Sequence, residues 1–461
     1  MFRNEQGEIS KSAIKLAGNR REIDAVALQS VLQFGVMVPP LAPYKGVTRL
    51  TPVDSYSAED FKKWKEKPIT KKSQKNIEKD LQRLIELLDN QLKTIERPIV
   101  LFSGGIDSGL IAARLAALKK SETLLVHFSF GKKDPETRVA IKMASYLGLR
   151  IECVEAFEKG LLRCLECPGR IFPLPFADES TAPMTVLANH LISREDTKNA
   201  TIIDGTGADG VFGLGNKTYK WSKLFLIPKE LRKILALPYS LGFWKRPGET
   251  EYLCRLLRRS CDLPPWAAFI AQNALNKILY RQEESGKLLE VLNNWISERS
   301  GEQLNQRIYL ADVGLTCANI FAQKALPIFR DAGKTVCFPF LNSNVVQLGL
   351  ELLKAEEKHK PKTLLKTALK RQIPEVLFNR KKTGFTDPQK KIFYSSVFSN
   401  LISEAASDSS PLRPFLFRKN LLILRDMLAE GQKIPQQTLN CIWAIVFTDR
   451  WYRTAENGEC L

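Results

Sequence analysis

The feature of this sequence that most restricts its fold is a short apolar run followed by a loop with two adjacent glycines. Residues 98–102 read PIVLF, which is typical of a buried strand. Residues 103–108 (SGGIDS) follow, and residues 108–120 (SGLIAARLAALKK) are typical of a helix. A strand, a glycine loop and a helix in this order predict a ligand site at the carboxyl end of a strand in an open α/β sheet.

Strands and helices continue to alternate around this loop. Residues 123–130 (TLLVHFSF) and 149–156 (LRIECVEA) predict two further strands, with a helix over residues 136–148 between them. An amphipathic helix over residues 76–93 precedes the first strand, and residues 199–210 (NATIIDGTGADG) repeat the strand-then-glycine pattern. We therefore predict an α/β fold: a doubly wound parallel sheet with helices on both faces and a largely helical C-terminal half.

The chemistry of the glycine loop fits a phosphate chain. Gly104 and Gly105 allow backbone N–H groups to face a phosphate without a side chain in the way. Ser103 and Ser108 add hydroxyl donors, and the start of the helix adds the positive end of its dipole. Asp107 would repel a phosphate but suits a Mg²⁺ ion that bridges to one. An ordinary turn with Asp107 as a helix cap is the alternative, and the full hexapeptide in this context favours the phosphate site.

The hexapeptide resembles the signature of the pyrophosphate-loop ATP pyrophosphatases, which cleave ATP between its α- and β-phosphates. Segments further along the chain resemble the asparagine synthetase family in the order that the family shows them. These segments are residues 175–183 (PFADESTAP), 204–213 (DGTGADGVFG), 338–352 (FPFLNSNVVQLGLEL), 362–385 (KTLLKTALKRQIPEVLFNRKKTGF) and 439–453 (LNCIWAIVFTDRWYR). The resemblance covers roughly residues 76–453. It implies an ATP- and Mg²⁺-dependent enzyme that forms amides through an acyl-adenylate.

The resemblance also implies roles for single residues. Asp107 and Asp209 match the carboxylates that hold Mg²⁺. Lys382 matches the family's essential lysine, whose charge stabilises the phosphoryl oxygens while a carboxylate attacks the α-phosphorus. A core position explains Leu101 and Phe130 nearly as well as a nucleotide contact does, and a solvated basic run is the alternative for Lys382. The residues expected to contact the nucleotide are Leu101, Ser103, Gly104, Gly105, Asp107, Ser108, Phe130, Asp204 and Gly205.

Three positions depart from the family's pattern. Asparagine synthetases have Glu at the place of Thr206, where it helps to handle the incoming amine, and the β-lactam-forming relatives have Tyr. A threonine cannot accept a proton as a carboxylate does. Gly210 replaces another Glu, and Asn342 replaces the Asp of a PFLD segment. We therefore expect intact adenylation machinery with an altered amine site around Thr206, and a product that need not be asparagine.

Two parts are expected along the chain, residues 1–75 and residues 76–461. Residues 22–52 resemble the connector that precedes the synthetase half in the family. The family's glutaminase domain is missing before it, and no cysteine nucleophile follows Met1. We expect residues 1–75 to be a connector remnant and residues 76–461 to be an ATP-binding synthetase domain that cannot take ammonia from glutamine by the family's route.

Charge and cysteines bear on partners and location. The 461 residues include 69 Lys and Arg against 50 Asp and Glu, for a net charge of +19. Such an excess points to a polyanion such as nucleic acid, although a solvated basic face explains it equally well. No apolar run is long enough for a membrane helix and no secretory signal is present, so we expect a cytoplasmic protein without a membrane partner. Nine cysteines, an odd number, suit a reducing compartment, and Cys164 and Cys167 form half of a zinc motif without a second half.

The function expected is an ATP-dependent amide synthetase that activates a small-molecule or peptide carboxylate and transfers it to ammonia or an amine. Stand-alone relatives of this kind include lasso-peptide cyclases and other natural-product amide formers, so an amine of the substrate itself is an alternative nucleophile. A partner protein would supply ammonia or present the substrate. An RNA-modifying pyrophosphate-loop enzyme is a second hypothesis, which residues 204–213 and 362–385 disfavour. A non-catalytic nucleotide-binding protein is a third, which the joint presence of Asp107, Asp209 and Lys382 disfavours.

Overall fold

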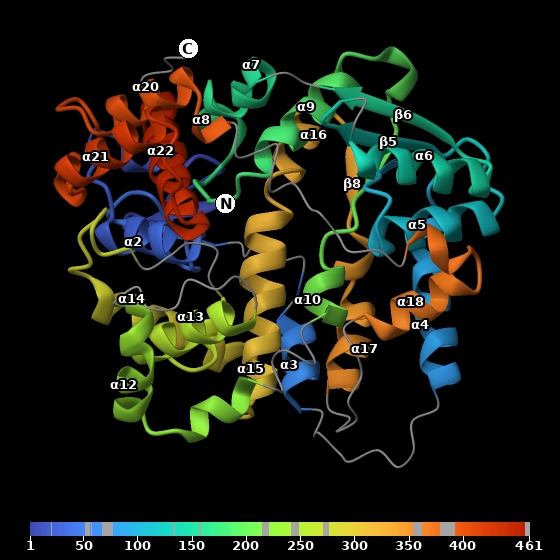
Figure 1. The fold of residues 1–461 in the computed structure, drawn as a ribbon, viewed down its shortest axis with the longest axis horizontal. Coiled ribbons are helices and arrows are strands. Elements are labelled where there is room, and N and C mark those ends of the chain that lie inside the picture. Colours follow the sequence, from blue (N-terminus) through green and yellow to red (C-terminus); the bar gives the residue numbers. More distant parts are fainter. Residues whose placement is uncertain are drawn as a thin grey trace.

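A parallel sheet with helices packed against it forms one side of the structure, which is a computed structural model; the sheet lies at the right in Figure 1. It describes residues 1–19, 21–50, 56, 58–66, 77–131, 134–155, 158–213, 221–240, 249–270, 276–353, 362–378 and 392–456.

The central sheet has five strands in the order β6-β5-β4-β7-β8, and every neighbouring pair is parallel. All residues of β4 and β5 are buried, which explains their continuous apolar sequences, since helices cover both faces of a parallel sheet. The predicted α/β fold is confirmed. The strands are β4 (Pro98–Leu101), β5 (Leu124–Ser129), β6 (Arg150–Glu155), β7 (Thr201–Ile203) and β8 (Thr335–Cys337).

The strand order reverses between β4 and β7. The chain passes from β4 outward to β5 and β6, and then returns to place β7 on the other side of β4. Loops that leave the carboxyl ends of two such strands diverge and open a crevice, which is where open α/β sheets bind ligands. The loops after β4 and β7 therefore define the expected site.

Helices lie on both faces of the sheet (Figure 1). α5 and α6 pack against each other and against β4, β5 and β6, whereas α9 and α16 pack against each other on β5, β6 and β8. The predicted helices at 76–93, 108–120 and 136–148 are all present, with ends that differ by up to three residues. α6 ends at Gly148 in the left-handed conformation, as a terminal glycine predicts. The helices are α4 (Ile77–Leu92), α5 (Ile106–Ala117), α6 (Pro135–Leu147), α9 (Thr181–Ile192) and α16 (Leu326–Asp331).

The C-terminal half is mainly helical, as predicted, but it also contributes β8. This strand has three residues, as β7 does, but no glycine-rich loop follows it to mark it in the sequence. α15 runs directly into η5 (Asp312–Phe321), a π-helix. The helices are α10 (Ala208–Gly213), α12 (Lys229–Ser240), α13 (Glu249–Asp262), α14 (Ser285–Arg299), α15 (Leu304–Ala311), α17 (Ser343–Leu353), α18 (Thr363–Lys370), α20 (Ser396–Ala405), α21 (Arg418–Ala429) and α22 (Gln436–Glu456).

Other helical segments, most of them one turn long, connect these elements. They are α1 (Ala13–Ala17), α3 (Ala58–Glu66), α7 (Glu158–Leu161), α8 (Pro168–Ile171), η1 (Leu162–Leu165), η2 (Glu195–Thr197), η3 (Lys223–Leu226), η4 (Ala267–Phe269), η6 (Pro339–Leu341), η7 (Glu375–Leu377) and η8 (Arg413–Phe415).

N-terminal residues pack against the C-terminal helix α22. β1 (Phe2–Asn4), β2 (Ile9–Ser10) and β3 (Val47–Arg49) form a small antiparallel sheet. α2 (Ala25–Phe34) packs on α14 and α22, and the Tyr452 hydroxyl donates to the Pro43 carbonyl at 3.0 Å (Figure 1). A separate unit over residues 1–75 stays a prediction.

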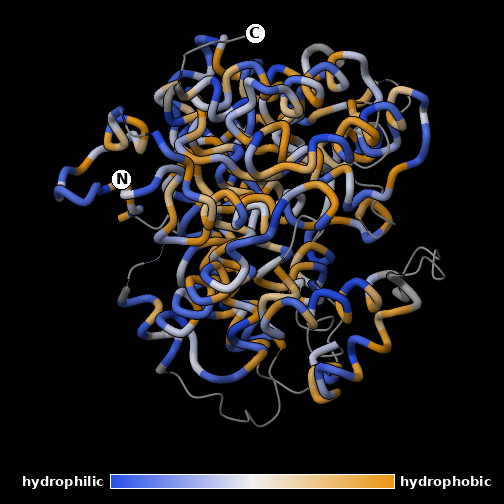
Figure 2. Tube along the Cα trace, turned by 90° about the vertical axis from the view of Figure 1, so that its left-hand side faces the viewer, coloured by the Kyte–Doolittle hydropathy of each residue, from blue (hydrophilic) through white to orange (hydrophobic). Residues whose placement is uncertain are grey.

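Apolar side chains from all parts of the chain join one large cluster, which runs from Phe2 to Tyr452. The tube in Figure 2 alternates between hydrophobic and hydrophilic residues within single helices, as burial of one helix face requires. In the part of the chain that the structure describes, no helix combines the length and the apolar character that crossing a membrane demands.

Candidate functional site

The loop after β4 presents two hydroxyl groups beside a helix start. The Oγ atoms of Ser103 and Ser108 lie 3.1 Å apart, and Ser108 Oγ accepts a hydrogen bond from the Ser103 N–H. Gly104 has a φ of +67°, and a Cβ there would lie 3.0 Å from Cα of Ala140 in α6. α5 begins at Ile106, so the positive end of its dipole lies at the same loop. The loop has the donors and the close backbone packing that a phosphate site needs.

The loop after β7 packs directly against the first loop. A Cβ at Gly205 would lie 3.3 Å from Cβ of Asp107, so the two loops are in near contact. Gly207 has a φ of +101°, and a Cβ there would lie 2.5 Å from Cδ2 of Leu341. A side chain at position 207 would therefore collide with Leu341, and one at position 205 would press against Asp107.

The two aspartates of this second loop lie in different environments. Asp204 is buried, and its Oδ1 accepts a hydrogen bond from the Thr206 N–H at 2.7 Å, which closes the turn. Asp209 lies in the first turn of α10, and its side chain is 72% exposed. Asp209 can therefore reach a ligand, while Asp204 shapes the loop.

A lysine joins the two loops. Lys362 Nζ lies 2.7 and 2.6 Å from the two carboxylate oxygens of Asp107, and 2.8 Å from Oδ1 of Asp209. Lys362 precedes α18 with a φ of +57°, and its N–H donates to the Phe212 carbonyl at 2.9 Å. Burial disfavours the charged form, but the two carboxylates outweigh burial and raise the pKa of Lys362. The ammonium therefore stays charged between the carboxylates.

The same two carboxylates suit a Mg²⁺ ion. They come from separate loops and already converge on one cation, the Lys362 ammonium. Mg²⁺ in nucleotide sites is held by one or two carboxylates, and phosphate oxygens and water complete its shell. Among the described residues, no group of three or more His, Cys, Asp or Glu side chains could hold a metal. A metal at Asp107 and Asp209 would therefore depend on the nucleotide for further ligands.

The remaining predicted contacts lie at the same edge or outside the described residues. Leu101 ends β4 and is 9% exposed. Phe130 follows β5 and packs edge-on against Phe128, with ring centroids 4.9 Å apart. Both positions fit a core role as well as a nucleotide contact, so their roles stay predictions. Lys382 lies outside the described residues, and its role also stays a prediction.

Sequence reasoning missed Lys362. The residue opens the matched segment 362–385, in which Lys382 is the lysine that matches the family's essential one. Its contact with Asp107 spans 255 positions of sequence, and no periodicity predicts such a contact. The available signal was its place at the start of a helix that follows the glycine-rich segments.

Segment 175–183 forms a second polar cluster. Lys324 Nζ lies 3.1 Å from Oδ2 of Asp178 and 2.7 Å from Oγ of Ser180, and both charged side chains are largely buried. Burial, together with the neighbouring Asp178, raises the pKa of Glu179 to about 7. A buried ion pair thus holds the segment that resembles the family's substrate-side loop.

The departure at Gly210 has a steric cause. A Cβ at this position would lie 2.6 Å from Sγ of Cys317 and 3.0 Å from Oδ2 of Asp312, both in η5. A side chain at position 210 would therefore displace the buried side chains of Cys317 and Asp312. Burial, with a contribution from the Asp209 charge, raises the pKa of Asp312 to about 7. A carboxyl group is therefore present beside position 210, but η5 supplies it.

The cysteine pair does not form a zinc site. Cys164 is a buried free thiol whose Sγ lies 3.5 Å from the Leu161 carbonyl oxygen, whereas Cys167 is disulfide-bonded. The two sulfurs are therefore not ligands of one ion. The disulfide at Cys167 also differs from the reduced cysteines that the composition suggested.

Comparison with known proteins agrees with this geometry. The sequence profile of the family described as asparagine synthase matches residues 81–453. The chain is also similar to asparagine synthetase [glutamine-hydrolyzing] 1 of Bacillus subtilis (strain 168). The two are 24% identical over 482 residues, which cover 97% of this chain and 72% of the relative.

Proposed function

Because the chain belongs to the asparagine synthase family, we propose that it activates a carboxylate with ATP as an acyl-adenylate and then transfers the acyl group to ammonia or an amine. The observation that supports this most is the meeting of Asp107, Asp209 and Lys362 at the carboxyl ends of β4 and β7. Two carboxylates that can hold Mg²⁺ and a largely buried ammonium lie where the strand order reverses, and together they suit the Mg²⁺-bound phosphate chain of a nucleotide.

In this proposal the glycine loop binds the phosphates through the Ser103 and Ser108 hydroxyls and the start of α5. Asp107 and Asp209 would hold Mg²⁺, which would supply positive charge to the phosphate oxygens. Lys362 now contacts the carboxylate oxygens that a metal would use. We infer that its ammonium passes to the phosphate chain when a metal binds these carboxylates.

The first half-reaction needs fixed positive charge. As the substrate carboxylate attacks the α-phosphorus, negative charge grows on the phosphoryl oxygens, and a cation held in place by the protein lowers that barrier. Lys362 is such a cation, because its backbone is held to Phe212 and its side chain is largely buried. Lys382 is proposed as the second.

The second half-reaction differs from that of the glutamine-dependent relatives. Thr206 brings no carboxylate to the loop, and a carboxylate side chain at position 210 would displace Cys317 and Asp312 of η5. We propose that the nucleophile is ammonia from a partner protein or an amine that belongs to the substrate, as in natural-product amide formers. The substrate would be a small-molecule or peptide acid.

Product analysis tests the adenylation step. The purified chain is incubated with Mg²⁺-ATP, ammonium and a panel of free acids and short peptides whose carboxylates carry ¹⁸O. We expect AMP and pyrophosphate in equal amounts, with one ¹⁸O atom in the AMP, and no reaction after chelation of Mg²⁺. Release of ADP and phosphate, or AMP without the label, would contradict adenylation.

A further inference from the structure

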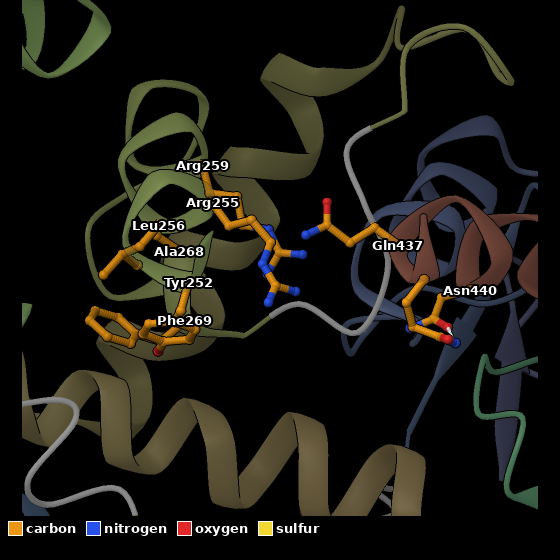
Figure 3. A pocket seen from close by; sticks show the side chains of 9 residues that line it. Tyr252, Arg255, Leu256, Arg259, Ala268, Phe269, Gln437 and Asn440 are labelled. Atoms are coloured by element: carbon orange, nitrogen blue, oxygen red, sulfur yellow. Dashed lines mark hydrogen bonds between the residues drawn. The ribbon is translucent and has the colours of Figure 1, made fainter. Parts of the chain in front are cut away.

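A cavity separate from the glycine loops lies between α13, η4 and the start of α22 (Figure 3). It offers about 160 Å³ to the centres of water molecules. One water needs roughly 10–15 Å³ by this measure. The cavity could therefore hold about ten water molecules, or a ligand of the same volume. Its walls include Tyr252, Arg255 and Arg259 of α13, Phe269 of η4, and Gln436 and Gln437 of α22.

One side of the cavity is positively charged. Arg255 and Arg259 are four residues apart on α13, so they lie on one face of the helix, and both extend toward Gln437 (Figure 3). α22 is a helix of 21 residues that begins at Gln436, so the positive end of its dipole lies at the opposite wall. None of the nine described residues that line the cavity is acidic. These features favour an anionic ligand.

The polar side chains are partly held in place. With the Gln437 amide turned so that its oxygen faces α13, this oxygen accepts hydrogen bonds from Nη1 and Nε of Arg255 at 3.0 and 2.8 Å. Gln436 Nε2 donates to Oδ1 of Asn440 at 2.8 Å. Gln436 Oε1 is shielded from solvent and has no hydrogen-bond partner among the described residues. A buried acceptor in this state favours a ligand that brings an N–H donor.

The other side of the cavity is apolar and aromatic. Leu256 and Ala268 are buried, and the rings of Tyr252 and Phe269 lie beside them (Figure 3). Such a wall suits an apolar or aromatic side chain next to the charged group. A carboxylate, an amide N–H and an apolar side chain occur together in a peptide that contains an acidic residue.

We propose that this cavity binds an acidic residue of a peptide, with Arg255 and Arg259 on its carboxylate, Gln436 on a backbone N–H, and Tyr252 and Phe269 against a neighbouring side chain. This deepens the proposed function, on which it rests for the reaction, by assigning the substrate to the class of acidic peptides.

The position of the cavity agrees with an anchor remote from the reacting carboxylate. η4 packs on α15, and η5, the continuation of α15, packs on α10, which carries Asp209. One helix thus lies between the cavity and the nucleotide loops. A helix with its side chains is about 10–12 Å wide, and an extended chain spans about 3.3–3.6 Å per residue. The anchored residue would therefore lie about three or more residues from the carboxylate that is activated.

Binding of matched peptides tests the proposal without the reaction. The probes are N-acetyl-Phe-Asp-Gly-amide and its Asn counterpart, titrated into the full chain and followed by ligand-observed NMR. We expect the Asp probe to bind about tenfold or more tightly than the Asn probe. A hydrogen bond between arginine and a carboxylate is stronger than one between arginine and a neutral amide. Arg255→Gln and Arg259→Gln should each remove most of this preference.

Arg258→Gln is the matched control, since Arg258 lies on the same helix, is exposed and does not line the cavity. It removes the same charge and should change binding less than twofold. Circular dichroism and melting curves check that each variant folds. Equal binding of the two probes, or an equal loss in Arg258→Gln, would overturn the proposal.

A variant of the nucleotide site separates the two hypotheses. Asp107→Asn should retain the Asp preference of the probes while it loses pyrophosphate release. Normal probe binding in a chain that never forms AMP would refute adenylation alone. Adenylation of acids without any Asp preference in probe binding would refute the anchor alone.

Discussion

The nucleotide loops and the arginine cavity differ in how their residues are brought together. Each loop is a short segment after one strand, and its glycines and aspartates lie within six consecutive residues, 103–108 or 204–209. The cavity takes its walls from α13, η4 and α22, which are up to 188 positions apart. A site built from backbone geometry leaves a motif in the sequence, whereas a site built from packed helices leaves none.

The two regions also use charge differently. In the crevice, the carboxylates of Asp107 and Asp209 flank one lysine, so the site is suited to binding a cation. In the cavity, two arginines and the start of α22 give positive charge, so the site is suited to binding an anion. If this comparison is right, variants of the nucleotide loops should leave peptide binding at the cavity unchanged, and variants of the cavity should leave the nucleotide loops intact.

The largest effect is expected for Asp107→Asn. The change removes a proposed metal ligand and a partner of Lys362, so pyrophosphate release should fall on the order of 10³-fold or more. The measurement is initial-rate pyrophosphate release at saturating Mg²⁺-ATP, with any acid that the product screen identifies. A rate within tenfold of the wild type would show that Asp107 is not in the reacting site.

Lys362→Met is expected to have the second-largest effect on the rate of pyrophosphate release. Loss of one fixed cation should lower the rate about 10²–10³-fold, as for other electrostatic contacts to a transition state. The variant also leaves Asp107 and Asp209 facing each other without the ammonium, so its dependence on Mg²⁺ concentration should change. Lys370→Met, at the exposed end of the same helix, is the control and should keep wild-type rates. Equal losses in both variants would point to a general effect of charge.

A smaller effect is expected for Gly207→Ala. The methyl group would lie 2.5 Å from Leu341 at a φ that disfavours side chains, which should lower the free energy of unfolding by about 1–3 kcal/mol. Displacement of the loop that carries Asp209 should reduce the rate by on the order of 10²-fold. Gly286→Ala, in α14 with open space around it, should be neutral or slightly stabilising in the same denaturation assay. An unaffected Gly207→Ala would mean that Leu341 can move aside.

Periodicity predicted the sheet well where strands are long and flanked by glycine, as at β4, β5 and β6. It missed β8, which has three residues and follows a helical region, because its place is set by pairing with β7 and not by its own pattern. It also missed the small sheet of β1, β2 and β3, in which β1 pairs with β3 across more than forty residues. In both cases distant partners decide the structure.

The site shows the same division. Asp107, Asp204, Gly205 and Asp209 were predicted from local motifs, and the structure brings their loops into contact. Lys362 was missed, because its position between two carboxylates depends on how α18 packs on α5 and α10. The steric reason for Gly210 depends on a π-helix a hundred residues away, which no local pattern indicates.

Asp312 lies between the two regions, and its titration gives the last test. Its charge acts on Asp209 on one side and on Tyr252 on the other. Burial raises its pKa to about 7 from 3.8. The folded structure therefore favours the neutral form, and the stability contributed by Asp312 is lost as the pH rises from about 4 to about 7.

Asp312→Asn removes this titration. We expect the variant to gain stability relative to the wild type as the pH rises, with a change on the order of 2 kcal/mol between pH 5 and pH 8 in chemical denaturation. A difference that stays constant with pH would show that water or a cation reaches Asp312 in the folded chain, and that this helix does not insulate the acidic crevice from the basic cavity.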